Sequence, residues 1–183
     1  IQIRIDANQG WAKEDALEVL TQLAPYAIEF CEQPMHKYYD DYLPALCAQS
    51  PVKIMADESV FTHHDARKLI ANKACHSINI KFSKSGGIQE AIKIHDIAKA
   101  NNIPCMMGGM LESRVALSAK MHFAMAMDNV LFYDMDTCLI GHTIDPVIGG
   151  VEFNGMHISI GETPGIGAEV DPAYLRNLES CTI

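Results

Sequence analysis

The stretch SINIKFSKSGGIQEAIKIHDIAKANNIPCMM, residues 77–107, decides the fold that this sequence predicts. It begins with a β-rich run, Ser77–Phe82, and ends with a second one, Ile103–Met107. Between them, after Gly86-Gly87, the residues Ile88–Ala100 have the apolar spacing of an amphipathic helix. A strand, a helix and a second strand in this order predict a pair of parallel strands joined by a helical crossover.

The same alternation extends to both sides of this stretch. Further β-rich runs are Ile1–Asp6, Ala27–Glu32, Val52–Asp57 and Val130–Met135, and further helical runs are Ala12–Ala24, Tyr38–Ala48, Asp65–Ala74 and Ser113–Met127. Thr62 and Asp65 form a capping-box pattern at the start of one of these helices. Most strands are continuous apolar runs, which is typical of a parallel sheet covered on both faces.

Two architectures fit repeated βα units: an open doubly wound sheet and a (β/α)₈ barrel. No Gly-x-Gly-x-x-Gly turn follows the first strand, which disfavours the dinucleotide-binding version of the open sheet. Six units are countable, and the two that a barrel still needs would precede Ile1, where the chain starts in mid-strand without an initiator Met. We therefore predict an α/β protein of the TIM type, with strands 3–8 of the barrel and a hairpin extension over residues 149–161.

Composition excludes several classes of protein. The chain has 14 Lys+Arg against 23 Asp+Glu, a net charge of −9, which disfavours nucleic acid or an anionic membrane as the main partner. No apolar stretch approaches the length of a membrane span. The six cysteines form no Cys-x-x-Cys pair, so we expect free thiols and a cytoplasmic protein.

Three acidic residues end successive predicted strands: Asp6, Glu32 and Asp57, spaced by 26 and 25 residues. At the carboxyl ends of parallel barrel strands these side chains converge on the catalytic face. Three carboxylates close together repel one another unless a cation lies among them, and an all-oxygen ligand set suits Mg²⁺. The alternative is that each acid only caps the helix that follows it.

One unit further along, Lys81 ends the next predicted strand, 24 residues after Asp57. An ammonium beside a divalent cation should have its pKa lowered toward neutrality, as a lysine general base requires. Lysine with Mg²⁺ is a known solution for removing a proton next to a carboxylate. Lys84, three residues on, is expected in a loop, either solvated or at the rim of the site.

Asp134-Met135-Asp136 stands at the end of the last predicted strand. Two residues separated by one on a strand point to the same side. A cationic group of the substrate, such as an ammonium, would complement this pair. A second metal ion and two acids solvated in a loop remain as alternatives.

Four motifs together resemble the enolase superfamily, in the subgroup typified by muconate lactonizing enzyme. They are Asp6-Ala7-Asn8-Gln9-Gly10-Trp11, Glu32-Gln33-Pro34, Ala56-Asp57-Glu58-Ser59, and Asn79-Ile80-Lys81 with Lys84-Ser85-Gly86-Gly87. Within that subgroup, Asp134-Met135-Asp136 resembles the Asp-x-Asp motif of dipeptide epimerases of the Ala-Glu type.

The resemblance implies a role for each matching position. Asp6, Glu32 and Asp57 would hold Mg²⁺, which binds the substrate carboxylate, and Asn8 would support the metal site. Lys81 would be one of two acid/base lysines that exchange the α-proton of a dipeptide's C-terminal residue through an ene-diolate. Asp134 and Asp136 would bind the free ammonium at the amino terminus of the dipeptide.

The family's second lysine and its N-terminal capping domain would precede Ile1. We therefore predict that residues 1–183 are an incomplete C-terminal catalytic barrel domain, inactive and unstable in isolation because two sheet edges are unpaired. The expected partner is a small molecule, the dipeptide, and the complete enzyme is expected to be a homo-oligomer. Alternatives are N-acylamino-acid racemisation, o-succinylbenzoate synthesis or cycloisomerisation, and a barrel that binds amino compounds without chemistry.

Overall fold

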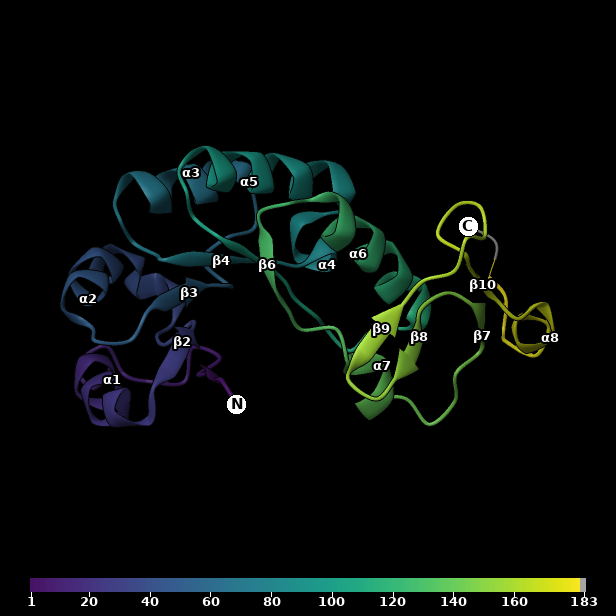
Figure 1. Cartoon of the computed structure of the whole chain (residues 1–183), viewed down its shortest axis with the longest axis horizontal. Coiled ribbons are helices and arrows are strands. Elements are labelled where there is room, and N and C mark those ends of the chain that lie inside the picture. The colour runs from purple at the N-terminus through teal and green to yellow at the C-terminus, as the bar shows by residue number, and fades with distance from the viewer. Residues whose placement is uncertain (182–183) are drawn as a thin grey trace. The chain divides into compact units, whose positions relative to one another are not determined.

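The chain forms two compact units in the computed structural model, which describes residues 1–181 (Figure 1). The sheet unit comprises Ile1–Gly108 and Asn129–Tyr133, and the C-terminal unit comprises Gly109–Asp128 and the residues from Asp134 onward.

Six parallel strands make up the sheet of the first unit, in the spatial order β1-β2-β3-β4-β5-β6. They are β1 (Ile3–Asp6), β2 (Ile28–Glu32), β3 (Ile54–Ala56), β4 (Ser77–Ile80), β5 (Cys105–Met107) and β6 (Val130–Tyr133). This sheet confirms the predicted TIM-type architecture, with β1 and β6 each paired on one side only within the described residues.

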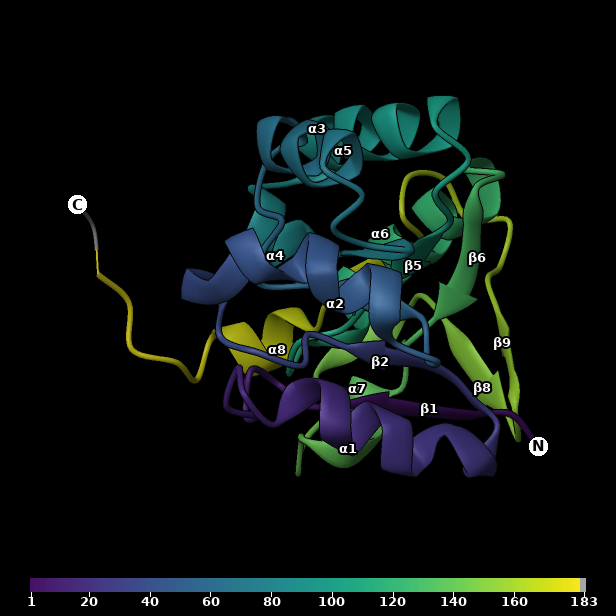
Figure 2. The ribbon, with the colours of Figure 1, turned by 90° about the vertical axis from the view of Figure 1, so that its left-hand side faces the viewer.

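Helices connect the strands along the outer face of the curved sheet (Figure 2). They are α1 (Ala16–Leu23), α2 (Leu43–Gln49), α3 (His63–Ala71), α4 (Phe82–Ser85) and α5 (Ile88–Ala100), with 3₁₀ turns η1 (Ala24–Tyr26) and η2 (Lys37–Tyr42). Thr62 and Asp65 cap α3 reciprocally, so the predicted capping box is confirmed. The prediction of α5 is confirmed at both ends.

The predicted strands were longer than the observed ones, and for the fourth strand the difference affects the site. The run Ser77–Phe82 leaves the sheet after Ile80, and Phe82–Ser85 forms the single-turn helix α4. Gly86 ends that turn with φ +79°, and Gly87 precedes α5 with φ +114°. Both angles lie in the left-handed region that glycine adopts without strain, so the glycine pair separates the two helices.

The inner face of the sheet holds an apolar cluster formed by Phe30, Met55 and Met106, with Phe132 packed against it. The rings of Phe30 and Phe132 meet edge to face with centroids 5.1 Å apart. The guanidinium of Arg4 lies 5.4 Å and 5.0 Å from these two ring centroids. Because strand side chains alternate with period two, the next inward position on each strand is two residues later, at its carboxyl end.

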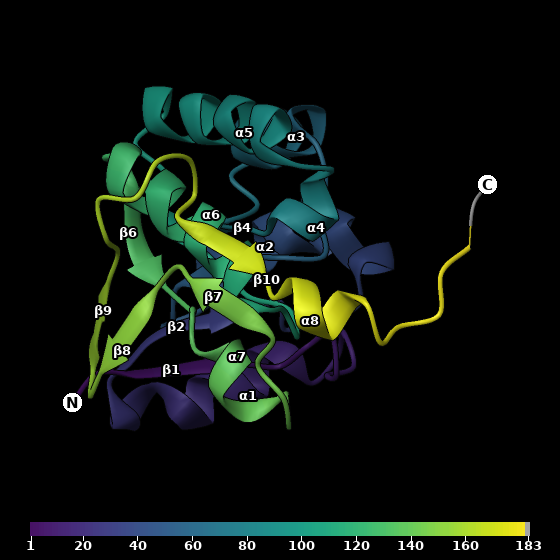
Figure 3. The same cartoon turned by 90° about the vertical axis from the view of Figure 1, so that its right-hand side faces the viewer.

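The C-terminal unit contains α6 (Arg114–Ala126), α7 (Thr137–Ile140), β7 (Val147–Gly149), β8 (Glu152–Asn154), β9 (His157–Ser159), β10 (Ala168–Val170) and α8 (Pro172–Leu175). Strands β8 and β9 pair antiparallel, with Phe153 opposite Ile158, which confirms the predicted hairpin. The antiparallel pair β7–β10 was not predicted (Figure 3).

Arg114 at the start of α6 connects that helix to the segment around β7. Its guanidinium pairs with Asp145 and donates to the main-chain oxygens of Val147, Gly149 and Val151. No helix within residues 1–181 combines the length and apolarity that crossing a membrane requires.

Candidate active site

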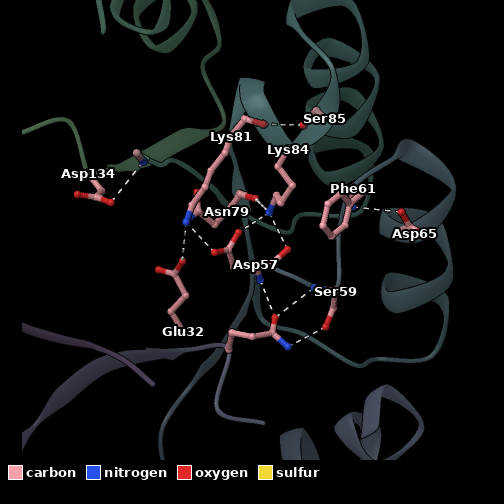
Figure 4. Close-up of polar contacts among 12 residues, drawn as sticks. Glu32, Asp57, Ser59, Phe61, Asp65, Asn79, Lys81, Lys84, Ser85 and Asp134 are labelled. Atoms are coloured by element: carbon pink, nitrogen blue, oxygen red, sulfur yellow. Dashed lines mark hydrogen bonds and ion pairs between the residues drawn. The ribbon is translucent and has the colours of Figure 1, made fainter. Parts of the chain in front are cut away.

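Glu32, Asp57 and Lys81 meet at the carboxyl ends of β2, β3 and β4 (Figure 4). Lys81 Nζ lies 2.7 Å from Asp57 Oδ2 and 4.0 Å from Glu32 Oε1. All three residues are buried. The structure therefore brings together the lysine and two of the three carboxylates that the sequence singled out.

The strand register explains why these acids converge. Glu32 lies two residues after Phe30, and Asp57 two residues after Met55, so both continue the inner face of the sheet. Asp6 is the register partner of Glu32 on β1. The Asp6 side chain is exposed, and its Oδ1 accepts a hydrogen bond of 2.8 Å from the main-chain N–H of Asn8.

Lys84 was expected in a loop, either solvated or at the rim of the site; it lies instead in helix α4, and it is not solvated. The turn of helix α4 directs its side chain back to the site, where it is only 7% exposed. Its Nζ pairs with Asp57 Oδ1 and donates to the main-chain oxygens of Asp57, at 2.6 Å, and Asn79, at 3.0 Å. Each carboxylate oxygen of Asp57 thus has its own lysine.

The two lysines and Asp57 shift one another's pKa. Burial alone would raise the pKa of Asp57, but the charges and hydrogen bonds of Lys84 and Lys81 outweigh it and lower that pKa. Burial lowers the pKa of Lys84 despite the opposing charge of Asp57. For Lys81, burial is outweighed by its hydrogen bond to Asp57 and by the surrounding carboxylates, so its pKa is raised. The expected lowering of the Lys81 pKa requires an additional positive charge among these acids.

Asn79 holds the Glu32 side chain from the neighbouring strand β4. Its Nδ2 donates to Glu32 Oε1 at 2.6 Å, and its Oδ1 is buried without a hydrogen-bond partner among the described residues. Burial raises the pKa of Glu32 to about 8, assisted by the charges of Asp6 and Asp57 and opposed by the hydrogen bond from Asn79. An additional positive charge close to this carboxyl group would lower that pKa.

Gln33 is a supporting residue that sequence reasoning missed as a site residue, although it lies in a quoted motif. Its Oε1 accepts from the N–H groups of Asp57, at 2.9 Å, and Ser59, at 3.3 Å. Its Nε2 donates to Ser59 Oγ at 2.8 Å and to the main-chain oxygen of Met35 at 3.1 Å. This fully buried amide fixes the loop after β3, and with it the backbone of Asp57.

The donor set fits a hard divalent cation, because carboxylate oxygens are the ligands that Mg²⁺ prefers. Burial is the main cause of the raised pKa values of Asp6 and Glu32, and the repulsion between the acids, which a cation would relieve, adds to it. Within residues 1–181, however, no three His, Cys, Asp or Glu side chains form a ready-made metal cluster. Asp57 faces two lysines instead, and the metal role of the three acids stays a prediction.

Asp134 and Asp136 belong to the C-terminal unit. Asp134 is half-buried, and its Oδ2 accepts a hydrogen bond of 3.3 Å from the N–H of Gly109. Strand β6 ends at Tyr133, and the exposed Asp136 is the residue preceding helix α7. The strand rule that placed both acids on one side therefore does not apply to them, and their role stays a prediction.

The chain is similar in sequence to a known protein family and to characterised relatives. A family model described as "Enolase C-terminal domain-like" matches residues 1–174. The chain is 42% identical over 184 residues to a D-Ala-D/L-Ala epimerase of Cytophaga hutchinsonii, covering 100% of this chain and 50% of that protein. It is 38% identical over 171 residues to an L-Ala-D/L-Glu epimerase of Bacillus subtilis, covering 91% of this chain and 46% of that protein.

A solved structure shows the same arrangement of elements. It is that of a dipeptide epimerase from Cytophaga hutchinsonii complexed with Mg and the dipeptide D-Ala-L-Val, and it superposes with a TM-score of 0.94 at 42% identity. The match covers 98% of this chain and 49% of that one. The chain thus spans about half the length of the relatives it matches.

Proposed function

The chain belongs to the enolase C-terminal domain-like family, and from this premise we propose that it is the catalytic half of a Mg²⁺-dependent dipeptide epimerase. The reaction would invert the α-carbon of the dipeptide's C-terminal residue by a 1,1-proton transfer. The observation that carries the proposal is the position of Lys81, buried between the carboxylates of Asp57 and Glu32 at adjacent strand ends. The two relatives that are 42% and 38% identical to this chain over the aligned residues are a D-Ala-D/L-Ala epimerase and an L-Ala-D/L-Glu epimerase, which supports the proposal.

Asp6, Glu32 and Asp57 would hold the metal ion. Bound there, Mg²⁺ would draw electron density from the substrate carboxylate and make the neighbouring α-proton more acidic. Lys81, as the neutral amine, would take that proton on its Nζ from one face of the α-carbon. A second lysine, outside this sequence, would deliver a proton to the opposite face, so that one proton leaves and one arrives in each inversion.

The rest of the protein would supply what these 183 residues lack. We propose that a complete polypeptide of the relatives' length contributes the first barrel strands and a capping domain before Ile1. We also propose a cytoplasmic homo-oligomer that binds neither nucleic acid nor membranes. The six cysteines are all free thiols, which supports a cytoplasmic location. The net charge of −9 argues against nucleic acid as a binding partner.

The central test is solvent proton exchange at the substrate. The complete polypeptide would be incubated with Mg²⁺ and pooled L,L-dipeptides in D₂O, and mass spectrometry would detect dipeptides that gain one deuterium. We expect deuterium at the α-carbon of the C-terminal residue, and no exchange after chelation of the metal. Exchange of N-acylated amino acids alone, with none for any dipeptide, would contradict the proposed substrate.

Asp134 and Asp136 test the dipeptide assignment separately, because only a free amino terminus offers an ammonium to bind. Replacing both by asparagine should reduce kcat/KM for a dipeptide by about tenfold or more, the usual effect of losing a charge pair in a binding site. The same change should leave exchange of an N-succinyl amino acid, where the wild-type protein shows any, nearly unaltered. Equal losses for both substrates would contradict the proposed ammonium site.

A further inference from the structure

Lys84 is held in the site by a complete set of hydrogen-bond acceptors. An ammonium group has three donors, and Lys84 Nζ directs them to Asp57 Oδ1, to the main-chain oxygen of Asp57 at 2.6 Å and to that of Asn79 at 3.0 Å. Two of these acceptors are backbone atoms at the ends of β3 and β4 (Figure 4). Since the sheet fixes those atoms, it also fixes the position of the Lys84 ammonium.

Lys81 is held differently. Within residues 1–181 its Nζ contacts only side-chain oxygens, Asp57 Oδ2 at 2.7 Å and Glu32 Oε1 at 4.0 Å. A cation among the acids would compete for these same oxygens. The competition would not reach the backbone oxygens that hold Lys84. One lysine is therefore anchored to the sheet, and the other can be displaced from the carboxylate.

Asp57 is constrained on two sides as a result. Its main-chain N–H donates to Gln33 Oε1 at 2.9 Å, which fixes the backbone, and Lys84 engages Oδ1, which opposes rotation of the carboxylate. The remaining oxygen, Oδ2, is directed toward Lys81, on the side where Glu32 lies (Figure 4). This is the oxygen that a shared cation would need.

We propose that Lys84 is a positioning residue that holds Asp57 so that Oδ2 alone is presented to the metal ion, while Lys81 is released from Asp57 to serve the substrate. This inference rests on the proposed function for the identity of the cation. In this role Lys84 favours metal binding by orienting Asp57, although its positive charge alone would oppose it. By charge, a buried ammonium beside a cation site repels the cation, so removing it would strengthen metal binding.

The sign of the change in metal affinity therefore decides between the two roles. In the complete polypeptide, Mg²⁺ binding would be measured by titration calorimetry for the wild type, Lys84→Met and Lys84→Arg. We expect Lys84→Met to bind Mg²⁺ about 10- to 100-fold more weakly, the usual cost of losing a residue that orients a metal ligand. Lys84→Arg, which retains the charge and several donors, should recover part of the loss.

The matched control is Lys93→Met, which removes a lysine whose side chain is 57% exposed on α5 and should leave Mg²⁺ binding unchanged. Lys84→Met binding Mg²⁺ as tightly as the wild type, or more tightly, would overturn the proposal. If that variant does not fold, as judged by thermal melting without metal, Lys84→Leu, which is likewise neutral and donates no hydrogen bond, is decided by the same criterion.

The experiment separates this inference from the proposed function. Metal binding is measured without substrate, so a protein that binds Mg²⁺ and loses it on Lys84→Met supports the positioning role even when no dipeptide exchanges its α-proton. A wild-type protein that binds no Mg²⁺ would overturn both.

Discussion

Replacing Gly108 by alanine should disturb the site through a single contact. A Cβ at Gly108 would stand 2.1 Å from Asn79 Oδ1, 2.5 Å from Nδ2 and 2.6 Å from Cγ, so the whole Asn79 amide must move. That amide is buried, and it donates the 2.6 Å hydrogen bond to Glu32 Oε1. The substitution therefore reaches a proposed metal ligand without touching it.

The magnitude follows from three contributions. Leaving the buried Glu32 oxygen without its donor costs about 1 to 3 kcal/mol. Overpacking at a tight site costs a further 1 to 3 kcal/mol or so. The reduced freedom of the unfolded chain when glycine becomes alanine offsets roughly 0.4 to 1 kcal/mol. We therefore expect the free energy of unfolding to fall by about 1 to 5 kcal/mol.

Urea denaturation of the complete polypeptide would measure this loss. The matched control is Gly161→Ala, because the nearest atom to its added Cβ, Thr163 Oγ1, lies at an ordinary contact distance of 3.8 Å. A double-mutant cycle with Asn79→Ala tests the cause, since removing the amide removes the clash and the two losses should not add. A Gly108→Ala protein as stable as the wild type, or additive losses in the cycle, would refute the reasoning.

Four further predictions concern the base, a helix cap and the thiols. Lys81→Ala should slow dipeptide α-proton exchange by at least about 100-fold while Mg²⁺ binding persists; unchanged exchange would remove Lys81 as the base. Thr62→Ala should lower the free energy of unfolding by about 1 kcal/mol in urea, by removing one half of the α3 capping box. A thiol reagent should label native Cys138 and Cys181 well before the buried cysteines. Burial raises the pKa values of the buried thiols to about 12, so above about pH 9 these thiols ionise in the unfolded chain but not in the folded one. Their contribution to the free energy of unfolding should therefore be fully present below about pH 9 and decline above it. Urea midpoints that do not fall between about pH 8 and about pH 10.5 would contradict this.

Much of the fold could be predicted because its signals are local and repeated. Each βα unit carries its own alternation of apolar runs, and α5 was predicted at both ends because a glycine pair precedes it. Strand ends were less predictable. Strand β4 ends at Ile80, two residues earlier than the apolar pattern indicates, because Phe82–Ser85 forms a helical turn closed by Gly86. The short elements β7, β10 and α8 have no periodicity long enough to predict.

The candidate site divides in the same way. That Glu32, Asp57 and Lys81 share one edge of the sheet could be predicted from the residue order alone, because nearly equal spacing in parallel units places strand ends together. The burial of Lys84 against Asp57, and the hydrogen bonds by which Gln33 and Asn79 hold the two acids, became visible only in the folded arrangement. These contacts join residues from different βα units. They depend on the angle at which a single-turn helix leaves the sheet and on which buried donors remain to be satisfied, and neither is encoded in any local stretch of residues.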